Sequence, residues 1–218
     1  MWITIHSGSR NVGHTTAQHY IALAHPEGKV KDGAYAFDVD SKEGIDYIKD
    51  LNVCLEFALY NRKLMIENIV ECIQKFVDGE ASDMFINRTH NHAESEDGIH
   101  WIHRKGATHA LKDMYGVIPG NMLDGCFIVK GKGNEASLYS SSHGAGRLMS
   151  RKKASQSFIL EEVQEQMVDI AGTVYESTLD EAPGAYKNIY EVIDLQSDLI
   201  DVRSEERRVG KECRSRWS

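Results

Sequence analysis

The sequence predicts an α+β fold. Residues 41–77 carry apolar side chains at spacings of three, four and seven, which is typical of one long helix, or of two helices with a break near residues 50–52. Shorter helices are predicted over residues 12–24 and 189–202. Strand-forming side chains gather in short segments, at residues 2–5, 99–103, 126–130 and 137–140. Because these segments do not alternate regularly with helices, the pattern favours α+β over a doubly wound parallel sheet.

The composition is that of a globular protein. The 218 residues are 41% hydrophobic and 27% charged, and they are enough to form a core. A net charge of -8 excludes a general basic field for nucleic acid, so any RNA contact would need a local patch. No apolar run approaches the roughly 20 residues that span a bilayer, and we expect no membrane partner. Four cysteines without paired spacing predict a reducing, cytoplasmic setting.

Residues 140–151 carry the most chemistry in the chain. His143 lies between a run of serines and a Gly-Ala-Gly turn. A neutral imidazole in such a setting can attack phosphorus. The sequence after the turn is compatible with a helix, on which Arg147 and Arg151 would share one face and suit phosphate oxygens. A capped turn with a structural histidine explains the same pattern, and the segment alone does not decide between the two.

A second group of potential ligands lies at residues 89–94. His90, His92 and Glu94 fall within five residues, a high local density of metal-binding side chains. In an extended segment, His90 and His92 would point to the same side. The pattern therefore predicts a metal-ligand role, without indicating which histidine has it.

Two further polar groups have weaker signals. Asn61 and Arg62 interrupt the apolar stripe of the long helix. They could form a solvated edge of the helix or a polar pair that faces a ligand, and on their own they favour the solvated edge. Arg104 and Lys105 stand before Gly106 in a predicted basic turn that would suit a phosphate or a nucleic-acid backbone. Such turns are also common on any protein surface.

Five segments together resemble a known family. They are His6-Ser7-Gly8-Ser9-Arg10, His90-Asn91, His103 to Thr108, Pro119-Gly120-Asn121-Met122, and His143-Gly144-Ala145-Gly146-Arg147. Their order and spacing resemble the C-terminal half of RtcB-type RNA-splicing ligases, over about residues 2–202. The resemblance implies the layered RtcB-like fold with a central active-site cleft. It also implies that the N-terminal half is missing, so that Met1 is an internal position.

The resemblance implies a ligase that uses GTP and two Mn²⁺ ions to join RNA 3′-phosphate or 2′,3′-cyclic phosphate ends to 5′-hydroxyl ends. His143 matches the histidine that attacks the α-phosphate of GTP and carries GMP. His6 and His90 match metal ligands, whereas His92 does not. Arg10 and Arg104 match phosphate or RNA contacts. The positions that match guanylate contacts are Asn91, Pro119, Gly120, Asn121, Met122, Cys126, His143, Gly144, Ala145, Gly146 and Tyr186.

The chain also departs from the family's pattern. An upstream Asp-x-x-Cys-Gly motif with the bridging cysteine and an Asn-His-Phe motif with a third metal histidine are both missing. Asn121 and Cys126 stand where serines are usual. We therefore predict no ligation by this chain alone, and poor solubility or dependence on a partner chain.

The last 16 residues break from the preceding composition. Residues 203–218 are rich in arginine, lack any apolar period and resemble the translation of a sequencing-adaptor read-through. We therefore predict that the ligase-like domain is residues 1–202 and that the tail is not part of the fold.

Two other functions stay open at this point. One is a non-catalytic nucleotide- or RNA-binding relative that retains the pocket. The other is a metal-dependent phosphohydrolase built on His6, His90 and His92. The RNA target, in tRNA splicing or in RNA repair, and the oligomeric state are also left open.

Overall fold

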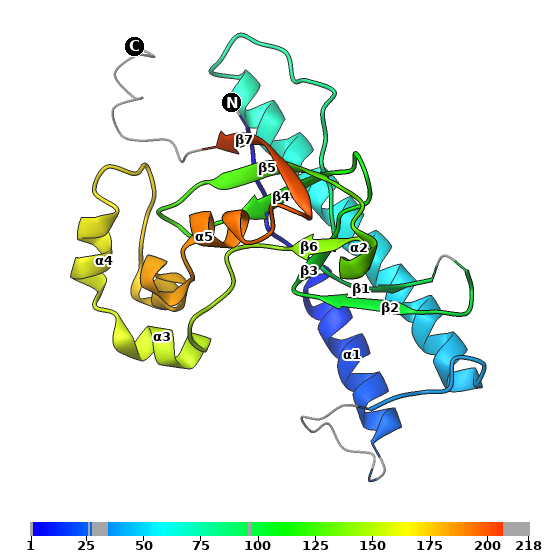
Figure 1. The fold of residues 1–218 in the computed structure, drawn as a ribbon. Coiled ribbons are helices and arrows are strands. Elements are labelled where there is room, and N and C mark those ends of the chain that lie inside the picture. Colours follow the sequence, from blue (N-terminus) through cyan, green and yellow to red (C-terminus); the bar gives the residue numbers. More distant parts are fainter. Residues whose placement is uncertain (1, 26, 28–34, 96, 207–218) are drawn as a thin grey trace. The chain divides into compact units, whose positions relative to one another are not determined.

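The structure is a computed structural model that describes residues 2–25, 27, 35–95 and 97–206 (Figure 1). The chain forms two compact units, Met1–His103 and Arg104–Ser218, here called unit 1 and unit 2. Helices and strands are both present, in agreement with the predicted α+β class. Within the described residues, no helix is both long and apolar enough to cross a bilayer.

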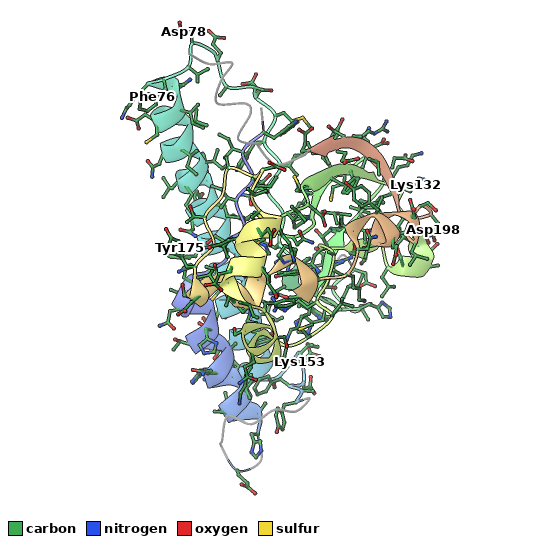
Figure 2. The ribbon with its side chains drawn as sticks, turned by 90° about the vertical axis from the view of Figure 1, so that its left-hand side faces the viewer. Phe76, Asp78, Lys132, Lys153, Tyr175 and Asp198 are labelled. Carbon is green, nitrogen blue, oxygen red and sulfur yellow. The ribbon has the colours of Figure 1, made fainter. Side chains whose placement is uncertain are left out.

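Unit 1 is built on two helices, α1 (Arg10–Ala24) and α2 (Lys42–Gln74). Both were predicted, and α2 is a single unbroken helix whose Ser41 side chain caps the Gly44 amide at 3.0 Å. The predicted strand at residues 2–5 is not formed; that segment has no regular structure. Figure 2 shows Phe76 and Asp78 at the far end of α2, where Phe76 is 88% exposed.

A buried tyrosine joins the two helices. The Tyr20 hydroxyl donates a hydrogen bond of 2.7 Å to an Asp50 carboxylate oxygen, and its ring packs edge-on against Tyr47. Burial, followed by the Asp50 hydrogen bond, raises the pKa of Tyr20 to about 12. The phenol therefore stays protonated at neutral pH and acts as a fixed donor between α1 and α2.

Strands β1 (Asn91–Glu94) and β2 (Ile102–Lys105) form a two-stranded sheet. The predicted strand at residues 99–103 is therefore shifted toward the C-terminus. Arg104 and Lys105 belong to β2 instead of a basic turn, and Gly106, with φ of +74°, makes the corner. Strand β3 (Ala107–His109) follows directly and pairs antiparallel with β6 (Ser140–Ser142).

The main sheet of unit 2 is antiparallel, with the order β4 (Tyr115–Pro119), β5 (Cys126–Gly131), β7 (Ile200–Glu206). Helix α5 (Ile189–Asp194) packs on it through Ile189 and Ile193 (Figure 1). The loops that follow β5 and precede β7 are tied together, because Lys132 Nζ donates to the Ser197 carbonyl at 2.6 Å. Figure 2 shows Lys132 and Asp198 at the same end of this unit.

Strand β7 corrects two predictions. The helix predicted over residues 189–202 ends at Asp194, because Ile200 is buried in the core and its backbone pairs with Gly131 of β5. The strand then continues to Glu206, which pairs with Cys126, so the boundary predicted after residue 202 falls inside a strand. The rest of the predicted tail, residues 207–218, lies outside the described residues.

A second, helical subcluster completes unit 2. It contains α3 (Arg151–Ser157), α4 (Leu160–Gln166) and the 3₁₀ turns η2 (Glu176–Glu181) and η3 (Pro183–Ala185). Val163, Met167 and Leu179 form its apolar core, against which Met122 packs. The strand predicted at residues 137–140 begins only at Ser140, as β6. Before it come the end of the 3₁₀ turn η1 (Glu135–Ser137) and the left-handed residues Leu138 and Tyr139.

Candidate functional site

The end of β6 presents His143, the predicted nucleophile. Its Nδ1 lies 2.6 Å from the carbonyl oxygen of Gly106. Because a carbonyl oxygen only accepts, Nδ1 carries the hydrogen and donates it. In the neutral ring, this tautomer places the lone pair on Nε2. The hydrogen bond therefore orients the imidazole and selects the nitrogen that can act as a nucleophile.

Gly106 is adapted to this contact. It adopts φ of +74°, a left-handed conformation that glycine tolerates best. A Cβ at this position would lie 3.5 Å from His143 Cε1. A side chain here would therefore strain the backbone, although its Cβ would make only an ordinary van der Waals contact with the imidazole.

Two buried polar side chains hold the strand that carries His143. Gln196 accepts a hydrogen bond from the Ser142 amide at 3.0 Å and donates to the Ser142 hydroxyl at 2.7 Å. Arg104 Nε donates to the Ser140 hydroxyl at 2.8 Å, and its NH2 group donates to the Leu138 carbonyl at 2.8 Å. Arg104 is only 2% exposed, so its predicted role as a phosphate or RNA contact is wrong. It positions β6 instead.

The Gly-Ala-Gly turn packs on the end of β4. The Ala145 amide donates to the Pro119 carbonyl at 3.0 Å, and a Cβ on Gly144 would lie 3.1 Å from the same oxygen. Pro119 also pairs with buried Cys126 across the sheet. Unit 2 therefore brings together the predicted guanylate residues of two separate motifs.

Asn121 shapes the loop between β4 and β5. Its side-chain oxygen accepts from the amides of Leu123 and Asp124, at 2.9 and 2.8 Å, and its Nδ2 donates to Asp124. The Gly120 amide donates to the Gly125 carbonyl at 2.9 Å. These contacts fix the loop that carries Gly120, Asn121 and Met122 beside the His143 turn.

Arg147 organises the other side of that turn. Its backbone forms an antiparallel bridge with Tyr186, and its guanidinium lies 5.0 Å from the centre of the Tyr186 ring. NH1 donates to the Tyr186 hydroxyl at 3.0 Å and to Glu181 at 3.4 Å, and NH2 donates to the Asp180 carbonyl. The Tyr186 hydroxyl in turn donates to Glu181. Tyr186 is therefore fixed relative to the turn that follows His143.

This arrangement corrects the predicted pair of arginines. Arg147 precedes α3, whereas Arg151 begins it, so the two do not share a helical face. They share partners instead, because Arg151 also pairs with Asp180 and Glu181. Hydrogen bonds to Asp180, ahead of those to Glu181, raise the pKa of Arg151. The two guanidiniums are neutralised by the chain's own carboxylates.

We expect Arg147→Met to lower the free energy of unfolding of unit 2 by roughly 2–3 kcal/mol, since it removes charge-assisted hydrogen bonds at a largely buried site. Arg151→Met is the matched control. The Arg151 side chain is 66% exposed, so the expected loss is below about 1 kcal/mol. Urea denaturation followed by circular dichroism measures both. Equal losses in the two variants would contradict the central role of Arg147.

In unit 1, His6 and His90 lie together. Their Nε2 atoms are 3.2 Å apart, and the two rings meet edge to face at an interplanar angle of 89°. Two nitrogens that each bind one ion at about 2.1 Å in a tetrahedral arrangement are about 3.4 Å apart. The observed separation therefore suits two ligands of one divalent cation. Imidazole nitrogen is a plausible donor for Mn²⁺.

The neighbouring histidine has different partners. His92 is 6% exposed; its Nδ1 lies 3.3 Å from the Thr89 hydroxyl and its Nε2 lies 3.7 Å from a Glu94 oxygen. Within residues 2–25, 27, 35–95 and 97–206, no three His, Cys, Asp or Glu side chains gather as a metal site. The described part of the chain thus supplies a pair of histidines. Asn91 and Arg10 are exposed in the same unit, Arg10 at the start of α1.

Arg62 and Asn61 contact the His6 segment. Arg62 is 9% exposed, with Nε donating to Asn87 at 2.6 Å and NH1 to the Ser7 carbonyl at 2.9 Å. Burial lowers the pKa of this guanidinium, although an arginine stays protonated at neutral pH. The interpretation of Asn61 and Arg62 as a solvated edge is therefore wrong for Arg62.

This chain belongs to the RtcB family: the family profile described as tRNA-splicing ligase RtcB matches residues 1–211. The family predicted from the motifs is thus confirmed. The RNA-splicing ligase RtcB of Escherichia coli (strain K12) is 36% identical over 218 residues, covering 93% of this chain and 53% of that protein. The tRNA-splicing ligase RtcB of Nanoarchaeum equitans is 31% identical, with 90% and 48% covered. The chain spans about half the length of the relatives it matches.

Proposed function

We propose that this chain provides the guanylylated histidine and two metal ligands of a GTP- and Mn²⁺-dependent RNA ligase. This ligase joins 3′-phosphate or 2′,3′-cyclic phosphate ends to 5′-hydroxyl ends. The hydrogen bond from His143 Nδ1 to Gly106 carries the proposal, because it leaves the lone pair on Nε2. Membership of a family of tRNA-splicing ligases supports the reaction class.

In the first step, the Nε2 lone pair of His143 attacks the α-phosphorus of GTP. A P–N bond forms, the bond between the α-phosphorus and the bridging oxygen breaks, and pyrophosphate leaves with that electron pair. An oxygen of the RNA 3′-phosphate then attacks the phosphorus of this GMP, so that a P–O bond forms, the P–N bond breaks and its electron pair returns to His143 Nε2. Finally, the 5′-hydroxyl oxygen attacks the activated 3′-phosphate, loses its proton, and GMP leaves.

The guanylate would lie against the surface formed by the Pro119–Met122 loop, the His143–Gly146 turn and Tyr186. The close contact of Ala145 with Pro119 and the bond of the Gly146 carbonyl to the Lys187 amide, at 3.0 Å, hold these parts in one unit. Arg147 fixes the Tyr186 ring, which could stack on the guanine. Buried Cys126 underlies the loop on β5.

His6 and His90 would hold a divalent cation. Such an ion polarises phosphate oxygens and offsets the negative charge that develops during transfer. The 3.2 Å separation of the two Nε2 atoms supports this role. Because a pair of histidines leaves other coordination positions open, further ligands would have to come from outside the described residues.

The test incubates the full-length gene product with α-labelled GTP and Mn²⁺. A GMP adduct that is labile to acid and stable to base supports the ligase. Binding of GTP without an adduct would indicate a non-catalytic nucleotide-binding relative. Release of phosphate without an adduct would indicate the phosphohydrolase.

We predict that residues 1–218 alone do not ligate RNA, because the described residues supply two metal-ligating side chains and catalytic metal sites usually need at least three. The measurement is a gel assay with labelled RNA that carries 3′-phosphate and 5′-hydroxyl ends. Sealed product from this chain at a rate like that of the full-length product would show that two histidines are sufficient.

A further inference from the structure

One buried guanidinium joins the two segments that carry His6 and His90. These histidines are 84 residues apart in sequence. Arg62, on α2, donates from NH1 to the carbonyl of Ser7, the residue after His6, at 2.9 Å. It donates from Nε to the side chain of Asn87, three residues before His90, at 2.6 Å. Arg62 is thus the direct link between both segments and the helix.

Two asparagines reinforce the same arrangement. Asn61 Nδ2 donates to the Ser7 hydroxyl at 3.1 Å and to the Gly8 carbonyl at 3.3 Å. Asn87 Nδ2 donates to the Leu59 carbonyl of α2 at 3.1 Å. Both histidine-bearing segments are therefore fixed to one short stretch of α2, residues 59–62.

Packing alone does not account for an arginine at this position. Arg62 is 9% exposed, and its NH2 atom is buried without a hydrogen-bond partner among the described residues. A buried charge with an unused donor costs free energy that an apolar side chain of similar length would not. The guanidinium instead fixes the distance between its two acceptors, the Asn87 side chain and the Ser7 carbonyl, because its nitrogens lie in a planar, rigid fork.

We propose that Arg62 is a positioning residue that holds the His6 and His90 imidazoles at a separation suited to chelating a divalent cation. The inference rests on the proposed metal role of these two histidines. When Arg62 holds the two segments, one ion can bind both imidazole nitrogens without first having to order two loops. Without Arg62, each histidine binds the ion separately, and the affinity gained from chelation by the pair is lost.

The test measures binding of Mn²⁺ alone to the 218-residue chain. Electron paramagnetic resonance counts free Mn²⁺, and paramagnetic broadening of assigned histidine ring signals shows which imidazoles bind it. In the wild type, His6 and His90 should broaden together. In Arg62→Met, we expect roughly tenfold weaker binding, a loss of the size that supporting residues of metal sites cause. The two signals should then broaden at different Mn²⁺ concentrations.

Lys63→Met is the matched control. It removes the same charge from the next position of α2, where Lys63 is exposed and pairs only with exposed Glu67 at 3.8 Å in the described structure. We expect unchanged binding. Arg62→Lys keeps the charge but not the fork, so it should restore binding only in part. Full restoration by lysine, or unchanged binding in Arg62→Met, would overturn the proposal.

Further variants separate this inference from the proposed function. If His6→Ala and His90→Ala leave Mn²⁺ binding unchanged, the metal site itself fails. If they abolish binding while Arg62→Met has no effect, only the positioning role fails. Should circular dichroism show that Arg62→Met unfolds α2, Asn87→Ala becomes the deciding variant. It removes the side chain that accepts the hydrogen bond of Arg62 Nε beside His90, and unchanged binding would then count against the proposal.

Discussion

Replacing His143 with alanine is expected to abolish the GMP adduct of the full-length gene product, a loss of at least roughly 1,000-fold, because no other group replaces the attacking nitrogen. The expectation follows from the Nδ1 hydrogen bond to Gly106, which assigns the lone pair to Nε2. The measurement is retention of α-labelled GMP on denatured protein, with acid and base treatment to identify a P–N bond. GTP binding should persist, since the surrounding turn is kept.

His100→Ala is the matched control, because it makes the same replacement of histidine by alanine outside the proposed site. The His100 side chain is 84% exposed and pairs with Asp97, and the pKa of Asp97 is lowered mainly by that hydrogen bond. Its removal should leave the adduct unchanged. A labelled adduct of normal yield in His143→Ala would place the nucleophile elsewhere. Loss of the adduct in both variants would indicate that the assay reports folding.

The features that could be predicted from the sequence are those set by local patterns. The period of apolar residues predicted α2, because it depends on residues that are close in sequence. The family could be predicted because each motif is a short run of neighbouring residues and the motifs follow one another in a fixed order. The predicted turns around Pro119 and His143 contact one another as the guanylate interpretation requires. Whether these residues bind a guanylate is still a prediction.

The features that could not be predicted depend on partners far apart in sequence. Arg147 and Arg151 read as phosphate ligands until Asp180 and Glu181, about 30 residues away, are seen to engage them. Gln196 has no local signal, and the local signal of Arg104 indicated a phosphate or RNA contact; only the fold shows that both side chains support β6. For Arg62 there was a signal, namely a charged residue beside the apolar stripe of a long helix, but its meaning depends on Ser7 and Asn87.

The helix prediction for residues 200–202 was wrong for a related reason. The local pattern indicated the end of a helix, but the backbone of these residues pairs with the otherwise open edge of β5 and forms β7. Helix propensity is worth a few tenths of a kcal/mol per residue, so burial of Ile200 and pairing with Gly131 easily outweigh it. The same pairing extends to Glu206, beyond the predicted end of the domain.

Gly131→Ala is expected to produce the largest loss of stability, at least about 3 kcal/mol, because overpacking against fixed backbone has no inexpensive relaxation. A Cβ on Gly131 would lie 2.3 Å from the Leu111 carbonyl oxygen and 2.4 Å from that of Ala110. Both are backbone atoms that follow β3. The Gly131 amide also donates to the Met114 carbonyl at 2.8 Å, so this strand end has little freedom to move.

Gly116→Ala tests whether the loss is specific to position 131. It lies in the same sheet, and its Cβ would meet only a Val129 methyl at 3.4 Å. We expect the free energy of unfolding to change by less than about 1 kcal/mol, since alanine is better tolerated than glycine within a strand.

Hydrogen exchange can assign the loss of stability in Gly131→Ala to unit 2, since the two units need not unfold together. The backbone that Gly131 contacts directly follows β3, which pairs with β6, and β6 presents His143. A folded Gly131→Ala protein of wild-type stability would therefore contradict both the packing of unit 2 and the way in which its sheet positions the histidine.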